Sequence, residues 1–171
     1  MPAPLSLLPR PSVPDESPFE TAQRRGVPMR VGPKHLLRAL SHYLEDEAMA
    51  QPGAPVVLAA FQDASRFTPA IARRYARLAQ RCSLVGALAT GLPVEPAPGL
   101  RGAVLGGRDR LRDQWTVTVV SPGFAGAQIA RDLGDTGPED ERRFEFVLTH
   151  DRDLVLLAAE ALMLRLLAME H

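Results

Sequence analysis

The chain has 171 residues and a mass of 18.6 kDa, which is enough for one domain of ordinary size. Its 20 basic and 20 acidic residues cancel, so the chain as a whole has no electrostatic bias toward nucleic acid or a membrane surface. A hydrophobic content of 46% excludes disorder of the whole chain, and a single cysteine excludes an internal disulfide framework or a multi-cysteine zinc site.

Proline is concentrated at the N-terminus, where eight of the sixteen prolines fall within the first 33 residues. We therefore expect residues 1–16 to form a proline-rich flexible leader and residues 17–171 to form one domain. Prolines interrupt the leucines of this leader and no basic segment precedes them, which is not the pattern of a targeting signal. The longest apolar stretch, residues 154–169, is shorter than the ~20 residues that a bilayer requires. These patterns predict a cytoplasmic protein with no membrane partner.

Two helices are predicted in the first third of the domain. Residues 17–25 begin with Ser17 and Glu20 at capping-box spacing, with a proline at the first helical position. Residues 33–49 have apolar side chains at intervals of three and four, which predicts a helix with one apolar face.

The next segment predicts a strand, a helix and a second strand. Residues 56–61 and 84–89 are short continuous apolar runs, as expected of strands buried on both faces. Between them, Thr68 and a following proline are typical of a helix start, and this helix should end near residue 81. This order favours a right-handed parallel crossover.

The last third of the chain completes the predicted elements. They are strands at residues 100–105, 115–120 and 144–148, and helices at residues 124–133 and 151–170. The predicted fold is therefore α/β, a single domain in which helices flank a central mixed sheet of five strands. The final helix is apolar nearly all round, so it needs cover on both sides. The sheet can cover one side; the other needs the N-terminal helices or a second subunit, and of these we favour a homodimer.

Few residues suggest catalysis or metal binding. His150, Asp151 and Asp153 could hold a metal, but a helix-capping turn explains them better. Cys82 lies between a predicted helix and a buried strand, which favours a structural thiol over a nucleophile. Metalloprotease, P-loop and nucleophile-elbow motifs are absent from the sequence. The sequence therefore predicts no catalytic and no metal-binding residues.

Three charged or polar features remain as candidate binding sites. The turn at residues 121–124, between a predicted strand and a predicted helix, offers free backbone N–H groups to an anion. Arg73, Arg77 and Arg81 share one helix face, which could receive phosphates but is more often a solvated surface. The acidic run at residues 45–47 lies near a helix C-terminus, where the dipole disfavours it, so it could mark a partner or ligand site.

Charge also separates along the chain. Residues 51–112 carry nine arginines against three acids, whereas residues 113–171 carry five arginines against eleven acids. Folding could bring these two segments together or leave two opposed patches that favour self-association.

Six stretches, taken in order, resemble the DICT family, a bacterial sensory domain that occurs with diguanylate cyclases and two-component systems. They are residues 36–46, 56–62, 67–79, 113–117, 121–125 and 143–151, within a likeness that covers about residues 17–168. Gln114 stands where the family usually has an acid, and His150 stands where it often has a tyrosine. The resemblance implies sensing or protein interaction, with the output supplied by kinase, cyclase or DNA-binding domains, and it brings no catalytic residues.

We therefore expect a non-catalytic sensory or regulatory module that binds a small molecule or a protein partner and acts through protein–protein interaction. Its partner would be a kinase, a cyclase or a transcription regulator, and the identity of any cofactor stays open. A pocket is expected at the C-terminal ends of the strands, where α/β sheets commonly bind ligands. The candidate lining residues are Phe61, Arg66, Arg73, Trp115 and Phe124.

An enzyme acting on a phosphorylated small metabolite is the alternative. It would hold the phosphate at the turn of residues 121–124 and use Arg66 for charge, but the sequence offers it no acid–base pair. Direct binding to nucleic acid is disfavoured by the zero net charge and by the lack of a recognition motif.

Overall fold

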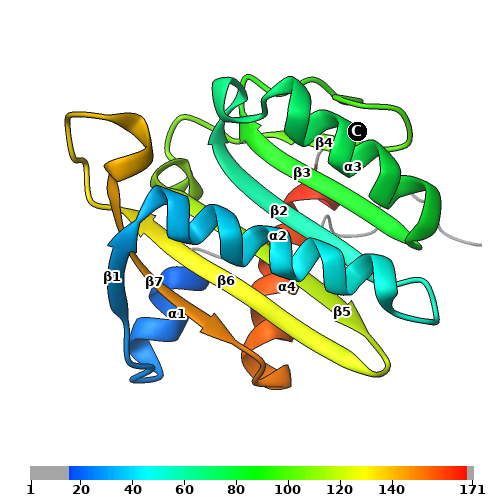
Figure 1. Cartoon of the computed structure of the whole chain (residues 1–171), viewed down its shortest axis with the longest axis horizontal. Coiled ribbons are helices and arrows are strands. Elements are labelled where there is room, and N and C mark those ends of the chain that lie inside the picture. The colour runs from blue at the N-terminus through cyan, green and yellow to red at the C-terminus, as the bar shows by residue number, and fades with distance from the viewer. Residues whose placement is uncertain (1–15, 169–171) are drawn as a thin grey trace, which may run out of the picture.

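The computed structural model describes residues 16–168, in which helices cover both faces of one sheet (Figure 1). Most of the predicted leader, and the last residues of the predicted final helix, lie outside the described residues. The described helices are α1 (Pro18–Arg24), α2 (Lys34–Ala50), α3 (Pro69–Arg81) and α4 (Arg152–Ala168), with short 3-10 turns η2 (Ala64–Arg66), η3 (Arg110–Asp113) and η4 (Glu139–Glu141). The strands are β1 (Arg30–Pro33), β2 (Val56–Asp63), β3 (Leu84–Thr90), β4 (Arg101–Val104), β5 (Gln114–Ser121), β6 (Phe124–Asp132) and β7 (Arg143–Thr149).

The described strands form one mixed sheet in the order β1-β7-β6-β5-β2-β3-β4. Strands β2, β3 and β4 are parallel, whereas β5, β6, β7 and β1 each run antiparallel to their neighbours. The α/β class, the mixed sheet and the parallel pairing of β2 with β3 around α3 are confirmed. The expected five strands are wrong, because the described sheet has seven.

The predicted helix at residues 124–133 is strand β6. This strand pairs along its length with β5 on one side and with β7 on the other, so it is a central strand covered on both faces. Its small residues let α2 approach closely, since a Cβ atom placed on Gly126 would lie 2.7 Å from a methyl group of Leu44. Tertiary packing therefore overrides the weak strand propensity of this alanine-rich segment.

Strand β1 was not predicted. Its four residues include Gly32 and Pro33, which leaves no run of strand-forming side chains to recognise. It lies at the edge of the sheet, where a proline is tolerated because one side of the strand needs no partner.

The predicted starts of α1, α3 and α4 have side-chain hydrogen bonds at the cap, whereas α2 begins after Pro33 without one. Ser17 and Glu20 form a reciprocal capping box at α1, and the Thr68 hydroxyl accepts a backbone N–H in the first turn of α3. At α4, the Asp151 carboxylate accepts the backbone N–H of Asp153 at 3.1 Å. The helix-capping interpretation of these aspartates is therefore the one that the structure supports.

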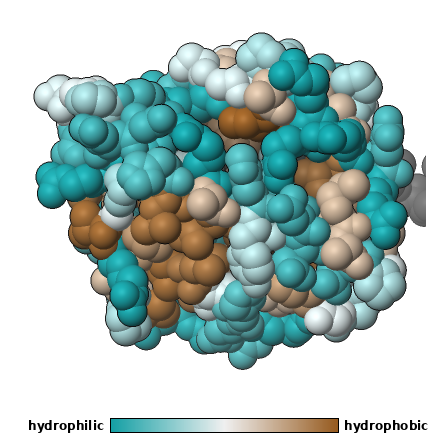
Figure 2. All heavy atoms as spheres, viewed as in Figure 1, coloured by the Kyte–Doolittle hydropathy of each residue, from teal (hydrophilic) through white to brown (hydrophobic). Residues whose placement is uncertain are grey.

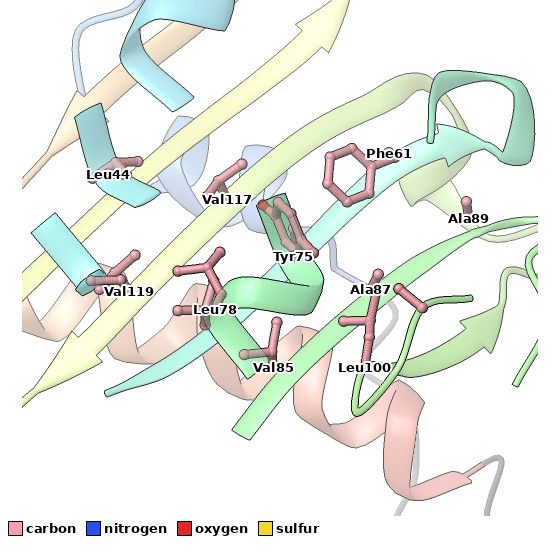
Figure 3. Packing of buried hydrophobic residues seen from close by; sticks show 14 of the residues in the cluster. Leu44, Phe61, Tyr75, Leu78, Val85, Ala87, Ala89, Leu100, Val117 and Val119 are labelled. Carbon is pink, nitrogen blue, oxygen red and sulfur yellow. The ribbon is translucent and has the colours of Figure 1, made fainter. Parts of the chain in front are cut away.

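The sheet separates two layers of hydrophobic core. Helices α2 and α3 cover one face, and α1 and α4 cover the other. Side chains of β2 alternate between them: Phe61 packs under α3, whereas Leu58 and Ala60 pack against α4. Figure 3 shows Tyr75 of α3 beside Phe61, with ring centroids 5.4 Å apart in an edge-to-face arrangement.

Helix α4 leaves an apolar stripe on its outer face. Leu156, Leu157 and Leu167 are 43%, 40% and 37% exposed, although the opposite side of the helix is fully packed. Arg165, buried on this helix, is neutralised by Asp109, whose carboxylate accepts its Nε at 2.7 Å. Across residues 16–168, the helices are too short or too polar to cross a membrane.

Candidate ligand-binding site

A cavity of about 640 Å³ opens between α2 and α3 at the C-terminal end of β2. Its volume is within the usual range of small-molecule sites, and its position agrees with the strand-end location expected from the sequence. The side chains around it come from helices, strand ends and short turns: Lys34, Arg38, Ser41, His42, Glu45, Phe61, Gln62, Ser65, Arg66, Thr68, Ala70, Ile71, Arg74, Trp115, Glu139 and Phe144.

Aromatic rings form the apolar part of this cavity. Trp115 and Phe144 pack edge to face with centroids 5.7 Å apart, and Phe61 contributes a third ring. The indole Nε1–H of Trp115 is buried and has no acceptor among the described residues. A buried donor without an acceptor costs about 1–3 kcal/mol.

A β-bulge shapes the wall of the cavity. The register of β2 against β3 shifts between Ala60 and Asp63, and Gln62 has a φ of 73°, in the left-handed region that disfavours side chains. Because of this bulge, the consecutive residues Phe61 and Gln62 both line the cavity instead of facing opposite sides of the sheet. Such strain costs about 1–3 kcal/mol, and it is commonly retained at binding sites.

One hydrogen bond ties the bulge to the neighbouring loop. The Gln62 side-chain amide donates to the Asp132 carboxylate at 3.2 Å, and the Gly134 backbone N–H donates to the same carboxylate at 2.8 Å. Arg142 adds an ion pair. Burial alone would raise the pKa of Asp132, but these three donors together hold it below its usual value.

Cations crowd one side of the cavity opening. Lys34 Nζ and Arg142 Nη1 contact Glu139 Oε1 at 2.9 and 3.1 Å, and Arg66 contacts the same oxygen. The hydrogen bond from Lys34 and the charges of all three cations lower the pKa of Glu139 to about 2. The adjacent Asp140 carboxylate accepts a hydrogen bond from Arg38 at 2.6 Å.

The cavity lining also includes a buried acid, Glu45 of α2. Glu45 is 5% exposed, and its carboxylate accepts the Nε–H of Arg74 at 2.8 Å. Burial raises the pKa of Glu45, against the opposing effects of Tyr75 and Arg74. Burial and the Glu45 carboxylate raise the pKa of the Tyr75 hydroxyl well above its usual value. Arg74 also pairs with Asp46, so α3 compensates the unfavourable position of the acidic run at the end of α2.

The structure brings together three of the five candidate lining residues. Phe61, Arg66 and Trp115 surround the cavity. Arg73 lies exposed on the outer side of α3, in line with the other arginines of that face, and does not line the cavity. Phe124 lies in the hairpin between β5 and β6, where its ring packs against His150 with centroids 5.5 Å apart.

The cavity also includes residues that the sequence did not single out. Gln62 and Glu139 are the most informative of these. No pattern among the residues next to them in the sequence marks either one as part of a binding site. The positive φ of Gln62 arises from the bulge, and Glu139 reaches Arg66 across 73 positions of the sequence.

The turn at residues 121–124 does not support an anion site. Residues Pro122 and Gly123 close a hairpin between β5 and β6, so no helix N-terminus follows. Arg152 already donates to the Ser121 and Pro122 carbonyl oxygens at 2.9 and 3.2 Å. The predicted phosphate-holding role of this turn was therefore wrong, because it assumed a helix in place of β6.

Residues 16–168 contain no group of three or more histidine, cysteine, aspartate or glutamate side chains that could hold a metal ion. The His150 ring instead contacts the Ala125 carbonyl oxygen through Nδ1 at 3.0 Å and packs edge to face against Tyr43.

Two solved structures are similar to this chain, and the first of them shares its fold. The polyphosphate kinase from Porphyromonas gingivalis matches with a TM-score of 0.53 and 13% identity, over 85% of this chain and 25% of the kinase. TrmBL2, an archaeal chromatin protein with a novel mode of DNA binding, matches with a TM-score of 0.46 and 14% identity, over 85% of this chain and 55% of TrmBL2. The chain thus spans a quarter to about half of these proteins, and at such low identity the kinase match shows the fold alone. No curated protein matches.

A family model gives a closer relationship. The model of the DICT family, described as a sensory domain in diguanylate cyclases and two-component systems, matches residues 19–133, which run from α1 to the end of β6. The similarity that the sequence suggested at residues 143–151 lies beyond the matched span and stays a prediction. Because the matched span is most of the chain, the protein belongs to the DICT family of sensory domains.

Proposed function

We propose that this protein is a non-catalytic sensory module of the bacterial cytoplasm that binds a small molecule in the cavity between α2 and α3. The observation that carries the proposal is the cavity itself, which combines an aromatic surface with charged side chains at its opening. The sensory character of the DICT family supports this use of the cavity.

The route of the signal is proposed from the packing of β2. Phe61 lies on the cavity side of this strand, and the preceding residue, Ala60, packs against α4 on the other face. A ligand that displaces Phe61 would therefore shift the strand on which α4 rests. The exposed leucines of α4 would then present a changed surface to a second copy of the chain or to a signalling protein such as a kinase, a cyclase or a transcription regulator.

Ligand binding can be tested by thermal unfolding against a broad set of metabolites. A molecule that binds the folded protein stabilises it by RT ln(1 + L/Kd), where L is the free ligand concentration, so its melting temperature rises with the logarithm of that concentration above Kd. Ala70→Phe, which adds a ring at the cavity lining, should abolish the shift. Ala39→Phe is the matched control, because Ala39 is exposed on α2 and does not line the cavity. A shift that survives Ala70→Phe, or no shift from any metabolite, overturns the proposal.

The homodimer is proposed to form through the leucine stripe of α4. Leu156→Glu should shift the molecular mass measured by light scattering from dimer to monomer, because a buried carboxylate at an apolar interface is costly. Leu36→Glu is the matched control, since Leu36 is 39% exposed on α2, on the opposite face of the sheet. Figure 2 shows that this face also has a hydrophobic patch beside α2. Dissociation by Leu36→Glu alone would place the interface there instead.

A further inference from the structure

Two of the cations at the cavity opening depend on Glu139 for their charge partner. Arg142 also pairs with Asp132, but Lys34 has no other ion pair among the described residues, and the next carboxylate to Arg66 is Asp63 at 3.9 Å. One carboxylate oxygen thus satisfies both Lys34 and Arg66, which lie at the opening of an apolar cavity.

The segment that carries Glu139 is weakly attached. Residues 136–141 are all exposed, and they form the loop beside the start of α2 at the upper left of Figure 1. The backbone hydrogen bonds of η4 are internal, from Glu141 N–H to the Pro138 carbonyl oxygen and from Arg142 N–H to the Glu139 carbonyl oxygen. The side chains of Glu139 and Asp140 join this turn to the cavity through exposed ion pairs, which contribute little stability each.

We propose that Glu139 occupies an anion subsite of the cavity and is displaced by a ligand with a flat apolar body and an anionic head group. This inference rests on the proposed sensory function. The apolar body would lie against the rings of Phe61 and Trp115, and a carboxylate, sulfonate or phosphate would replace Glu139 on Lys34 and Arg66. Displacement frees residues 136–141, so the ligand state becomes visible at the protein surface.

The charge of the site supports an anionic ligand. Of the four lysine or arginine side chains around the cavity, Arg74 is balanced by Glu45 and Asp46. The others, Lys34, Arg38 and Arg66, pair with Glu139 or Asp140 of one turn. Displacing this turn would leave Lys34 and Arg38 without these partners, and Arg66 with Asp63 at 3.9 Å, beside the aromatic rings. A neutral ligand would gain nothing from these cations, whereas an anionic one would satisfy them.

Two fluorescent probes separate the charge from the apolar body. Anilinonaphthalene sulfonate carries an anionic group on an aromatic body, and phenylnaphthylamine has the same rings without the sulfonate. Both should bind wild-type protein. Ala70→Phe should remove the fluorescence of probe bound in the cavity and leave the fluorescence of any probe bound at the exposed leucines of α4.

The decisive variant is Glu139→Gln, which keeps the shape of the side chain and removes its charge. It should tighten the binding of the sulfonate about fivefold, the factor expected when a weak exposed ion pair no longer competes, and leave the neutral probe unchanged. Arg66→Gln should weaken the sulfonate about tenfold. Arg73→Gln is the matched control, because Arg73 is exposed on α3 outside the cavity, and it should change neither probe.

Hydrogen exchange supplies the second measurement. Backbone amides of residues 136–141 should exchange faster when the sulfonate is bound and should not respond to the neutral probe. The inference is overturned if Glu139→Gln leaves the affinity for the sulfonate unchanged, or if Ala70→Phe affects neither probe. Neither result decides the proposed sensory function, because the metabolite screen tests that function separately.

Discussion

Replacing Arg142 with methionine should destabilise the fold by about 3 kcal/mol, because the change leaves the Asp132 carboxylate without its cation. The two side chains are only 11% and 9% exposed, so their pairing is shielded from solvent. Losing one partner of a buried pair costs about 3–5 kcal/mol, and the lower value is expected here because the Gly134 N–H and the Gln62 amide still bind the carboxylate. In a domain of this size, that loss lowers Tm by roughly 6–12 °C.

Urea unfolding followed by circular dichroism measures this loss directly. Arg143→Met is the matched control, because the neighbouring Arg143 pairs with Asp135 at a site where its own side chain is 61% exposed, and it should cost less than about 1 kcal/mol. Combining Arg142→Met with Asp132→Asn should recover part of the stability, since no buried charge then remains unpaired. Equal losses from Arg142→Met and Arg143→Met would refute the argument from burial.

Three further predictions concern packing, pH and thiol reactivity. Gly86→Ala should cost about 1–3 kcal/mol, because the new methyl group would lie 2.5 Å from a methyl group of Leu166; Gly106→Ala, with no neighbouring atom within 4 Å, should cost nothing in the same thermal melts. The depressed pKa of Glu139, about 2, means that its contribution to stability is present above its usual pKa of 4.5 and is lost as the pH falls from 4.5 toward 2; an unchanged acid unfolding curve in Glu139→Gln would contradict this. Burial raises the pKa of the Cys82 thiol, so iodoacetamide should alkylate it more slowly at pH 8 than it alkylates free cysteine, and unfolding in urea should remove the difference.

Features set by neighbouring residues could be predicted from the sequence. The capping box at Ser17, the cap at Thr68 and the continuous apolar runs of β2 and β3 each depend on a few adjacent positions, and the structure has all of them. Strand β6 could not be recognised, because its three alanines favour a helix and Ile129 is its one β-branched residue. The role of its small residues is visible only when α2 is packed against Gly126.

The same distinction applies to the cavity: residues at a predicted strand end could be anticipated, whereas a residue distant in the sequence could not. Phe61 is the last residue of a predicted strand and Arg66 follows it, and strand ends in α/β sheets commonly line binding sites. The opposite net charges of residues 51–112 and 113–171 indicated that these two segments could meet, but nothing local selects Glu139 as the partner of Arg66. That choice depends on the order of β5, β6 and β2 in the sheet.

The position of β7 determines how this protein can be shortened for experiments. Strand β7 lies between β6 and β1, so a fragment ending at residue 133 would leave β1 without a neighbour and would turn β6 into an open edge. The same cut would remove α4 and expose the apolar side chains that it covers on β2 and β6. We expect such a fragment to aggregate, because an unprotected hydrophobic edge invites pairing with other chains. The smallest stable folding unit should therefore extend well past the residues by which the family is recognised.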